Sequence, residues 1–483
     1  MRMPLNKWNV FFICVGLTLT IVGIALLATR NLTHEGLLKF ALRFGPGTTA
    51  YEVWQKPPDP ITMDIYFFNW TNPEDIDDPS IKPKFVEMGP YRYKHFKEKT
   101  NISWNDNNDT VTYTYLKYFY FDENSPRHFS DVITTINMVP LTTAHISNDW
   151  NLIVQTFITA PVRNASVYIR KTVKELMFDG YEDPVLSVLN SLPFLTDPDN
   201  NRFGWFYGRN GTVGTDGVFN MKTTDGDEFA TLQNWNYQND TKFFKGHCGK
   251  VHGSAGEMYP KNLKPTFIHL FSAEMCRTAK LNFVKNVTIK GIPGYKFSPG
   301  MEVFDNGSTL QRNVCYDNSF PSGLLNVSSC KDHSPTYLSL PHFYYADPLY
   351  LNIIEGLHPE QKKHELYVTL EPNTGIIIDL AARMQINVQL QPLPHFGNFA
   401  NLPNLILPVL WFDQQVAASD ELVSTLNLLF QLPSIIEIIS ALIVAMGVSC
   451  TIGVILYVKY IEMKNQKLRM IEKEEIPLNT TKS

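Results

Sequence analysis

The apolar stretch at residues 438–458 is the strongest constraint on how this chain can fold. It holds 21 residues and no charged side chain, with Glu437 just before it and Lys459 just after it. At about 1.5 Å of rise per residue, a helix of this length spans roughly 31 Å, the thickness of a bilayer's hydrocarbon core. Core helices of soluble proteins are rarely this long and this uniformly apolar. The stretch therefore predicts a transmembrane helix.

A second apolar stretch covers residues 10–28, between Lys7 and Arg30. The alternative is a cleaved signal peptide, whose apolar region of about 7–15 residues is followed by an A-x-A-like site. The stretch here is longer, and Ala25 and Ala28 lack that spacing. We therefore predict an uncleaved signal anchor and five segments: tail 1–9, span 10–28, domain 29–437, span 438–458 and tail 459–483.

The two tails are basic, which predicts their side of the membrane. Cytosolic flanks carry an excess of lysine and arginine, and the basic residues beside the spans are Arg2, Lys7, Lys459, Lys464, Lys467, Arg469 and Lys473. Both tails are therefore expected in the cytosol, with the large loop outside it. Residues 9–458 hold 34 basic and 43 acidic residues, a net charge of −9, which argues against a nucleic-acid partner.

N-x-S/T sequons support this topology, because such sites are glycosylated only outside the cytosol. Ten sequons lie between the two spans, and the first, at Asn31, is too near the bilayer to be a good acceptor. We expect glycans on surface loops at the other nine, which are Asn69, Asn101, Asn108, Asn164, Asn210, Asn239, Asn286, Asn306 and Asn326.

The cysteines also fit an oxidising compartment. Cys14 and Cys450 lie inside the spans, and the other four are Cys248, Cys276, Cys315 and Cys330. Four cysteines outside the cytosol predict disulfides, with three pairings open. The sequence has no C-x-x-C pair and no close histidine pair, so we expect no zinc site and no other metal.

The loop alternates strand-like and helix-like patterns, which predicts an α+β fold. Runs rich in branched and aromatic residues predict strands joined by Gly, Pro, Asn and Asp turns; they lie at 61–71, 87–96, 109–121, 211–221, 281–297, 364–381 and 384–393. Helices are predicted within 130–190, at 132–139, from 147 or 148 to Pro161, and at 166–178. A last helix, capped at Ser419-Asp420, leads into the second span.

Several motifs together resemble one family. They are GPGTTAYEVWQ (45–55), NWTNPED (69–75), EMGPYRY (87–93), VKELMFDGYEDP (173–184), KGIPGYKF (290–297), LSLPHFYYADP (338–348), EGLHPEQKKHELYVTLEPNTG (355–375) and LPVLW (407–411). In this order they are similar to the class B scavenger receptors, the family of platelet glycoprotein IV, lysosomal integral membrane protein II and insect sensory neuron membrane proteins. The resemblance covers nearly the whole chain.

The resemblance implies a large antiparallel β-barrel with a helical bundle, here at 130–190, at the end far from the membrane. It also implies an apolar tunnel through the barrel, along which lipids pass. Two disulfides can be carried over, Cys276–Cys330 and Cys248–Cys315, although this chain lacks the further close cysteine pair of many members. Ile65–Phe68 and Tyr344-Tyr345 are candidates to line the tunnel, but core packing is the favoured explanation for each.

The ligand-binding hypothesis centres on the predicted apex. One group is the apolar stripe of Trp150, Ile153, Val154 and Phe157, which Ile158 continues. It either packs in the bundle, which is the favoured interpretation, or docks ligand. The other is the cationic set Arg163, Arg170, Lys171 and Lys174, which is either a solvated face or an attraction for anionic ligands. Asn164 could carry a glycan beside Arg163.

No pattern for catalysis is found. GSAG at 253–256 lacks the G-x-S-x-G spacing of a nucleophile elbow, and no P-loop, GxGxxG or HExxH motif occurs. We therefore predict no enzymatic activity and no cofactor.

The resulting hypothesis is a class B scavenger receptor of the plasma membrane, whose partners are lipids, fatty acids, sterols, lipoproteins, the membrane itself or a protein ligand. Alternatives are a lysosomal or endosomal receptor that carries a hydrolase, and an adhesion protein without transport. The tail at 474–479 matches an acidic-dileucine sorting signal except at its last position, Asn479.

Overall fold

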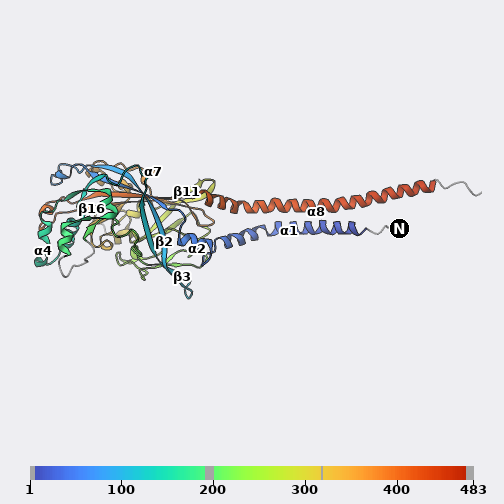
Figure 1. Ribbon diagram of the computed structural model, residues 1–483, viewed down its shortest axis with the longest axis horizontal. Helices are drawn as coiled ribbons and strands as arrows, with labels where there is room; N and C mark the ends of the chain where they lie inside the picture. Colours follow the sequence, from blue (N-terminus) through green and yellow to red (C-terminus); the bar gives the residue numbers. More distant parts are fainter. Residues whose placement is uncertain (1–5, 191–200, 317–318, 475–483) are drawn as a thin grey trace, which may run out of the picture. The chain divides into compact units, whose positions relative to one another are not determined.

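The computed structural model describes residues 6–190, 201–316 and 319–474, except for the side chains of residues 152–154, 157 and 472–474. It divides into two compact units (Figure 1). Unit 1 joins the chain ends, Met1–Arg43 and Asp420–Ser483, and unit 2 is Phe44–Ser419.

The helices are α1 (Lys7–Ala41), α2 (Thr49–Gln55), α3 (Met138–Ser147), α4 (Leu152–Val162), α5 (Pro184–Leu189), α6 (Leu349–Ile353), α7 (Gln361–His364) and α8 (Asp420–Glu474). The strands are β1 (Ile61–Trp70), β2 (Phe85–Asn105), β3 (Thr110–Phe121), β4 (Val132–Ile136), β5 (Tyr168–Thr172), β6 (Tyr181–Glu182), β7 (Arg202–Phe203), β8 (Phe219–Lys222), β9 (Leu232–Trp235), β10 (Phe267–Ser272), β11 (Arg277–Ile289), β12 (Ile292–Ser298), β13 (Leu325–Asn326), β14 (Thr336–Ser339), β15 (Tyr367–Leu370), β16 (Ile377–Leu390) and β17 (Leu405–Ala417).

Unit 1 consists of two long apolar helices, as the sequence predicts. Both α1 and α8 are long and apolar enough to cross a membrane. Each continues well past its apolar stretch, and the predicted helix after Ser419 joins the second span in one element of 55 residues. The compact unit 2 is therefore shorter than the loop between the two apolar stretches.

Glycines let α1 and α8 approach closely. A Cβ atom added to Gly16 would lie 2.8 Å from the Gly447 carbonyl oxygen, and one added to Gly447 would lie 2.6 Å from the Gly16 carbonyl oxygen. Small residues commonly permit such backbone contact between membrane helices. The Cys450 thiol donates to the Phe12 carbonyl across the same interface at 3.6 Å.

Gly447→Leu is expected to push the two helices apart, because the leucine side chain needs the space that α1 occupies. Cys450 should then react faster with a membrane-permeant maleimide, measured by mass spectrometry in intact membranes. Gly453→Leu is the matched control, because a Cβ atom at Gly453 would have no atom within 4 Å. Equal Cys450 reactivity in both variants would contradict the close contact.

Unit 2 is built on one large antiparallel sheet that is nearly closed. Its strand order is β10-β11-β12-β15-β16-β17-β1-β2-β3-β8-β9, with β13 and β14 attached through β16. Ser254 bridges Thr231, beside β9, and Leu270 on β10, so it links the two ends of the series. The predicted α+β class and large antiparallel sheet are confirmed, and most of the predicted strands appear.

A row of charged residues crosses the middle of this sheet. Arg383 on β16 lies opposite Asp413 on β17, Asp413 opposite Asp64 on β1, and Asp64 opposite Arg92 on β2. Arg92 binds both oxygens of Asp64 at 2.7 Å. Arg383 Nε lies 3.0 Å from Asp413 Oδ2, with both side chains 8% exposed. The outer arginines thus neutralise the two inner carboxylates.

Two of the helices predicted within 130–190 are wrong. Residues 132–136 form β4, which pairs with β5, and Thr134 lies opposite Arg170. The branched side chains of this run favour a strand once a partner strand is available. The predicted helix at 166–178 is β5 followed by a π-helical turn, Glu175–Asp179.

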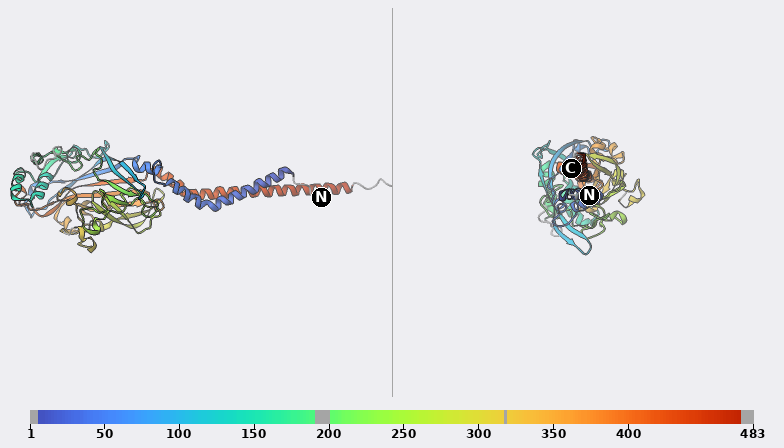
Figure 2. Two further views of the ribbon diagram at one scale, coloured as in Figure 1. Left: turned by 90° about the horizontal axis from the view of Figure 1, so that it is seen from below. Right: turned by 90° about the vertical axis from the view of Figure 1, so that its right-hand side faces the viewer.

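The helix predicted to end at Pro161 is present as α4, and α3 and α5 accompany it. Figures 1 and 2 show these helices at one end of unit 2, with α2 at the other end. The end that holds α3–α5 is therefore opposite the α2 end of unit 2 (Figures 1 and 2).

Both disulfides implied by the family resemblance are present. Cys248 is bonded to Cys315 and Cys276 to Cys330, across 67 and 54 residues of sequence. Disulfides that close loops of this length typically stabilise a fold by about 2–4 kcal/mol. The cysteines of α1 and α8, Cys14 and Cys450, are free.

Most of the sequons lie where a glycan can reach solvent. Exposed asparagines are Asn101, Asn108, Asn164, Asn210, Asn239 and Asn286, and half-buried ones are Asn69 and Asn326. Asn306 differs from the surface position expected of it, because it is 2% exposed. Its side-chain amide nitrogen donates to the Phe320 carbonyl at 2.7 Å, so a glycan on this nitrogen would have to replace one of its two N–H hydrogens at a buried position.

Candidate functional site

The predicted ligand-binding residues all belong to one part of unit 2, residues 130–190, which we call the helical lobe. It contains α3, α4 and α5 together with the β4–β5 pair. Gly397 lies against the C-terminal end of α4 with φ +57, and a Cβ atom there would lie 2.0 Å from the Arg163 carbonyl oxygen. The Asn398 amide donates to the Ala165 carbonyl at 3.0 Å, so the turn at 397–398 fixes the chain after α4.

The predicted apolar stripe contributes both to the lobe's core and to its surface. Ile158 is 1% exposed, whereas Trp150, which precedes α4, is 37% exposed. Gln155 is buried and donates to the carbonyls of Ser147 and Asn148, which covers the end of α3. The backbone of Ile153, Val154 and Phe157 lies in α4, but their side chains lie outside the described residues.

Three of the four predicted cations are paired with acidic neighbours. Arg170 lies 3.7 Å from Glu74, Lys171 lies 3.6 Å from Glu175, and Lys174 lies 2.9 Å from Asp179, measured between charged atoms. Arg163 is exposed, and no carboxylate of the described chain lies within ion-pairing distance of it. The lobe therefore carries less uncompensated positive charge than the sequence suggests.

The strand residues considered as tunnel walls are packed. Ile65, Phe67 and Phe68 are completely buried, and Tyr66 stacks on Trp411 with ring centroids 4.0 Å apart. Tyr344 and Tyr345 lie against each other at 4.1 Å, and Tyr345 is 39% exposed. Core packing accounts for the first group, as the sequence analysis allowed.

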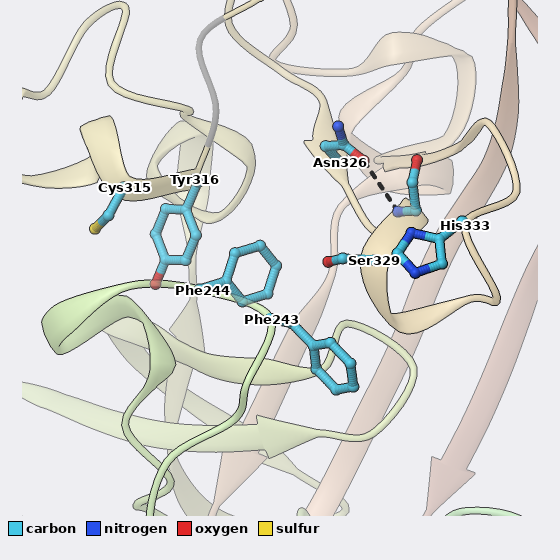
Figure 3. A pocket seen from close by; sticks show the side chains of 8 residues that line it. Phe243, Phe244, Cys315, Tyr316, Asn326, Ser329 and His333 are labelled. Atoms are coloured by element: carbon cyan, nitrogen blue, oxygen red, sulfur yellow. Dashed lines mark hydrogen bonds between the residues drawn. The ribbon is translucent and has the colours of Figure 1, made fainter. Parts of the chain in front are cut away.

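Two cavities flank the Tyr316 side chain. The larger has a volume of about 250 Å³. Figure 3 shows the rings of Tyr316 and Phe244 on one side of it and Asn326, Ser329 and His333 on the other. The second has a volume of about 130 Å³ and is lined by charged residues and histidines. Ligand pockets for drug-sized molecules measure about 300–1,000 Å³, so neither cavity is large enough for a whole lipid.

One group of side chains beside the two cavities has the spacing of metal ligands. Ligand atoms of His247, Cys248 and Cys315 lie within 4.8 Å of one another. Because the two cysteines form a disulfide, neither offers the thiolate that a metal would need.

Sequence reasoning missed a buried polar cluster around His342. His342 Nδ1 accepts from the His358 amide at 3.0 Å, so the ring proton is on Nε2 and is donated to Glu87 Oε2 at 2.6 Å. Trp411 Nε1 donates to the same oxygen at 2.8 Å. His342 has φ +53, and its amide donates to Gln385 at 2.6 Å, which holds this left-handed turn in place.

His364 extends this cluster by stacking on His342, with ring centroids 4.4 Å apart. Burial, followed by the positive charge of His342, lowers the pKa of His364 to about 4. Burial would raise the pKa of Glu87, but the hydrogen bonds from His342 and Trp411 outweigh it, and the pKa is lowered. The Glu87 carboxylate is therefore held by two hydrogen-bond donors, the His342 ring and the Trp411 indole. No periodic sequence pattern would have revealed it.

A second polar group lies in the separate core around Trp54. Lys99 is 1% exposed and donates to the Trp54 carbonyl, and its ammonium lies 2.6 Å from the Glu257 carboxylate. Burial lowers the pKa of Lys99 to about 8, while the negative charge of Glu257 opposes this shift. Lys97 pairs with the other Glu257 oxygen at 2.7 Å. The ion pair with Glu257 compensates the buried charge of Lys99, so this arrangement has a structural role in the core.

Comparison with known proteins decides the family. The sequence profile of the CD36 family matches residues 14–458. The chain belongs to the CD36 family. This confirms the resemblance to class B scavenger receptors and rests on nearly the whole chain, including both apolar helices.

Individual relatives of this CD36-family chain are similar over most of their length. Protein peste of Drosophila melanogaster is 35% identical, over 91% of this chain and 82% of the relative. Lysosome membrane protein 2 of Homo sapiens is 32% identical, over 83% of this chain and 84% of the relative. Scavenger receptor class B member 1 of Sus scrofa is 29% identical, over 90% of this chain and 86% of the relative. Two of these names describe a membrane protein and a receptor, and none names an enzyme.

Inside the sheet, His95 makes stability depend on pH. Its ring stacks on Phe119, with centroids 4.4 Å apart, and neither ring nitrogen has a hydrogen-bond partner. Burial, followed by the positive charges of Lys117 and Lys97, lowers the pKa of His95 to about 2. The unfolded chain binds a proton near pH 6.5, whereas the folded chain does not, so stability is full above pH 6.5 and falls as the pH drops.

His95→Phe is expected to remove about 2 kcal/mol of the loss in unfolding free energy between pH 7 and pH 5. The measurement is urea unfolding of the detergent-solubilised protein at both pH values, followed by tryptophan fluorescence. His395→Phe, at an exposed histidine, controls for the loss of a histidine as such. The same pH dependence in His95→Phe and in the native protein would refute this origin.

Proposed function

We propose that this CD36-family chain is a receptor that binds lipids or lipid-bearing particles at its helical lobe and conducts hydrophobic cargo through the interior of unit 2. The family match over residues 14–458 is the observation that carries the proposal. The similarity to a scavenger receptor over 90% of this chain supports it. The two apolar helices are consistent with a receptor held in a membrane.

The helical lobe is the proposed docking surface because it lies at the end of unit 2 opposite α2 (Figure 1). Half-exposed Trp150 offers an apolar ring, and Arg163 offers an uncompensated positive charge. Arg170, Lys171 and Lys174 are part of the proposed surface, but each shares its charge with a carboxylate. The binding of anionic lipid to the lobe should therefore depend most on Arg163.

Arg163→Glu is expected to weaken binding to phosphatidylserine vesicles at low salt, by about threefold to tenfold, because the exposed cation is reversed. Arg170→Glu, measured in parallel by vesicle flotation, should weaken it less, since its partner Glu74 already offsets the charge. Raising the salt concentration should reduce the difference between the variants. Unchanged binding by folded Arg163→Glu would exclude electrostatic docking at this lobe.

Conduction requires side chains inside unit 2 to move, because Ile65, Phe67 and Phe68 fill the strand core. We expect cells that express the protein to take up a labelled cholesteryl ester from lipoprotein faster than they take up the particle's protein. Dual labelling of lipid and protein measures the two rates. Particle binding with no excess of lipid uptake would reject conduction and leave an adhesion protein.

The proposed topology places the tails 1–9 and 459–483 in the cytosol and the domain at 29–437 outside it, at the plasma membrane. The similarity to lysosome membrane protein 2 favours a second candidate, a lysosomal receptor that carries a hydrolase on the lobe. Surface biotinylation of a tagged copy in native cells distinguishes the two locations. Protease added to intact cells tests the topology, because it should cleave the domain and spare both tails.

A further inference from the structure

The smaller cavity beside Tyr316 has a strongly cationic lining. It lies at the start of β11, between the turn at Gly246–Gly249 and the segment that follows β12. Three cations, Arg277, Lys280 and Arg312, line it, together with one carboxylate, Glu302. The lining also includes His247, His252 and His269. This group of residues is separate from the helical lobe and from the cluster around His342.

Arg277 is the unusual member of this lining. The residue is 3% exposed, and its Nε and Nη1 atoms are buried without a hydrogen-bond partner in the described part of the chain. Its guanidinium lies over the Tyr316 ring, 3.7 Å from the centroid. Buried polar groups are almost always hydrogen-bonded, and a buried cation without a partner is costly. An acceptor is therefore expected beside this guanidinium.

Asp305 is the carboxylate whose charge acts on Arg277, and it is already occupied. Burial lowers the pKa of Arg277, and the opposing effects of Tyr316 and Asp305 are smaller. The Asp305 carboxylate accepts from the amides of Gly307, Thr309 and Leu310, at 3.0–3.2 Å, and from the Asn313 side chain at 3.0 Å. Asp305 is thus held by other donors and does not serve as the acceptor for Arg277.

The second cation is also uncompensated. Lys280 lies over the Phe267 ring at 4.8 Å, and no described carboxylate forms an ion pair with it. Arg312, in contrast, is paired with Glu302 at 2.6 Å. The cavity thus has two positive charges without a counter-ion.

Two histidines line another side of the cavity. His252 lies before β10 and His269 on β10, with ring centroids 4.5 Å apart. His252 Nδ1 lies 3.3 Å from the Lys250 carbonyl, so this nitrogen is the donor, and Nε2 of the neutral ring is an acceptor. The donors for an anion are therefore the cations of the lining.

We propose that this cavity is a binding site for a phosphate group, held by Arg277 and Lys280. A phosphate offers more acceptor oxygens than a carboxylate, which suits a cavity lined by two cationic donors without a described counter-ion. The volume of about 130 Å³ has room for one such group but not for an acyl chain. The group belongs either to a free phosphate compound or to the headgroup of a phospholipid whose tails stay outside the cavity.

The test is calorimetric titration of the full-length protein in nanodiscs with inorganic phosphate at constant ionic strength. We expect saturable binding at one site. Arg277→Gln and Lys280→Gln should each weaken it by about tenfold or more, because each removes a charge-assisted hydrogen bond. Lys285→Gln is the matched control, since it removes one exposed positive charge from the same strand, β11, outside the cavity lining.

A second arm identifies the source of the group. Glycerol phosphate and phosphatidic acid vesicles are tested as competitors of inorganic phosphate. Competition by both indicates a lipid headgroup, and competition by glycerol phosphate alone indicates a free phosphate compound. No saturable phosphate binding, or equal weakening in Lys280→Gln and Lys285→Gln, would overturn the proposal. If Arg277→Gln does not fold, the comparison of these two lysine variants decides the question.

Discussion

The charged row through Arg383, Asp413, Asp64 and Arg92 sets the register on which the rest of unit 2 depends. Asp413 and Asp64 face each other on neighbouring strands, where like charges destabilise a pair unless each has a counter-ion. Burial raises the pKa of Asp413, the hydrogen bond from Gln415 and the positive charge of Arg383 oppose this, and the charge of Asp64 adds to it. A slip of one residue would leave buried charges unpaired, at a cost of about 3–5 kcal/mol each.

The sequence predicted the parts of the fold in which local preference and tertiary structure agree. The apolar lengths of α1 and α8 are set by a bilayer, and the β1 run of branched and aromatic residues suits a strand buried on both faces. The prediction of helices failed at β4 and β5, where short runs of apolar residues match a helical period by chance. Pairing between the two, with Ile133 opposite Lys171, decided the outcome there, and a single sequence does not display that pairing.

The candidate sites could be predicted only in part, for a related reason. Arg163, Arg170, Lys171 and Lys174 were recognisable as cations, but the sequence could not show that Glu74 comes within 3.7 Å of Arg170, because the two are 96 positions apart. Glu87 and His342 are 255 positions apart, and Trp411 comes from the last strand. Such clusters depend on the closure of the sheet, so the local composition of the sequence does not predict them. The same holds for the cavity that contains Arg277.

The adjacency of the first and last strands constrains how the chain is made. β1 pairs with β17, so Ile65 needs Phe412 as its neighbour. At a synthesis rate of about 5–20 residues per second, roughly 20–70 s pass between the synthesis of β1 and the synthesis of its partner strand β17. During that interval one edge of β1 is open to wrong partners. Completion of the sheet is therefore a late event that follows synthesis of nearly all of unit 2, and β1 needs protection from wrong partners until then.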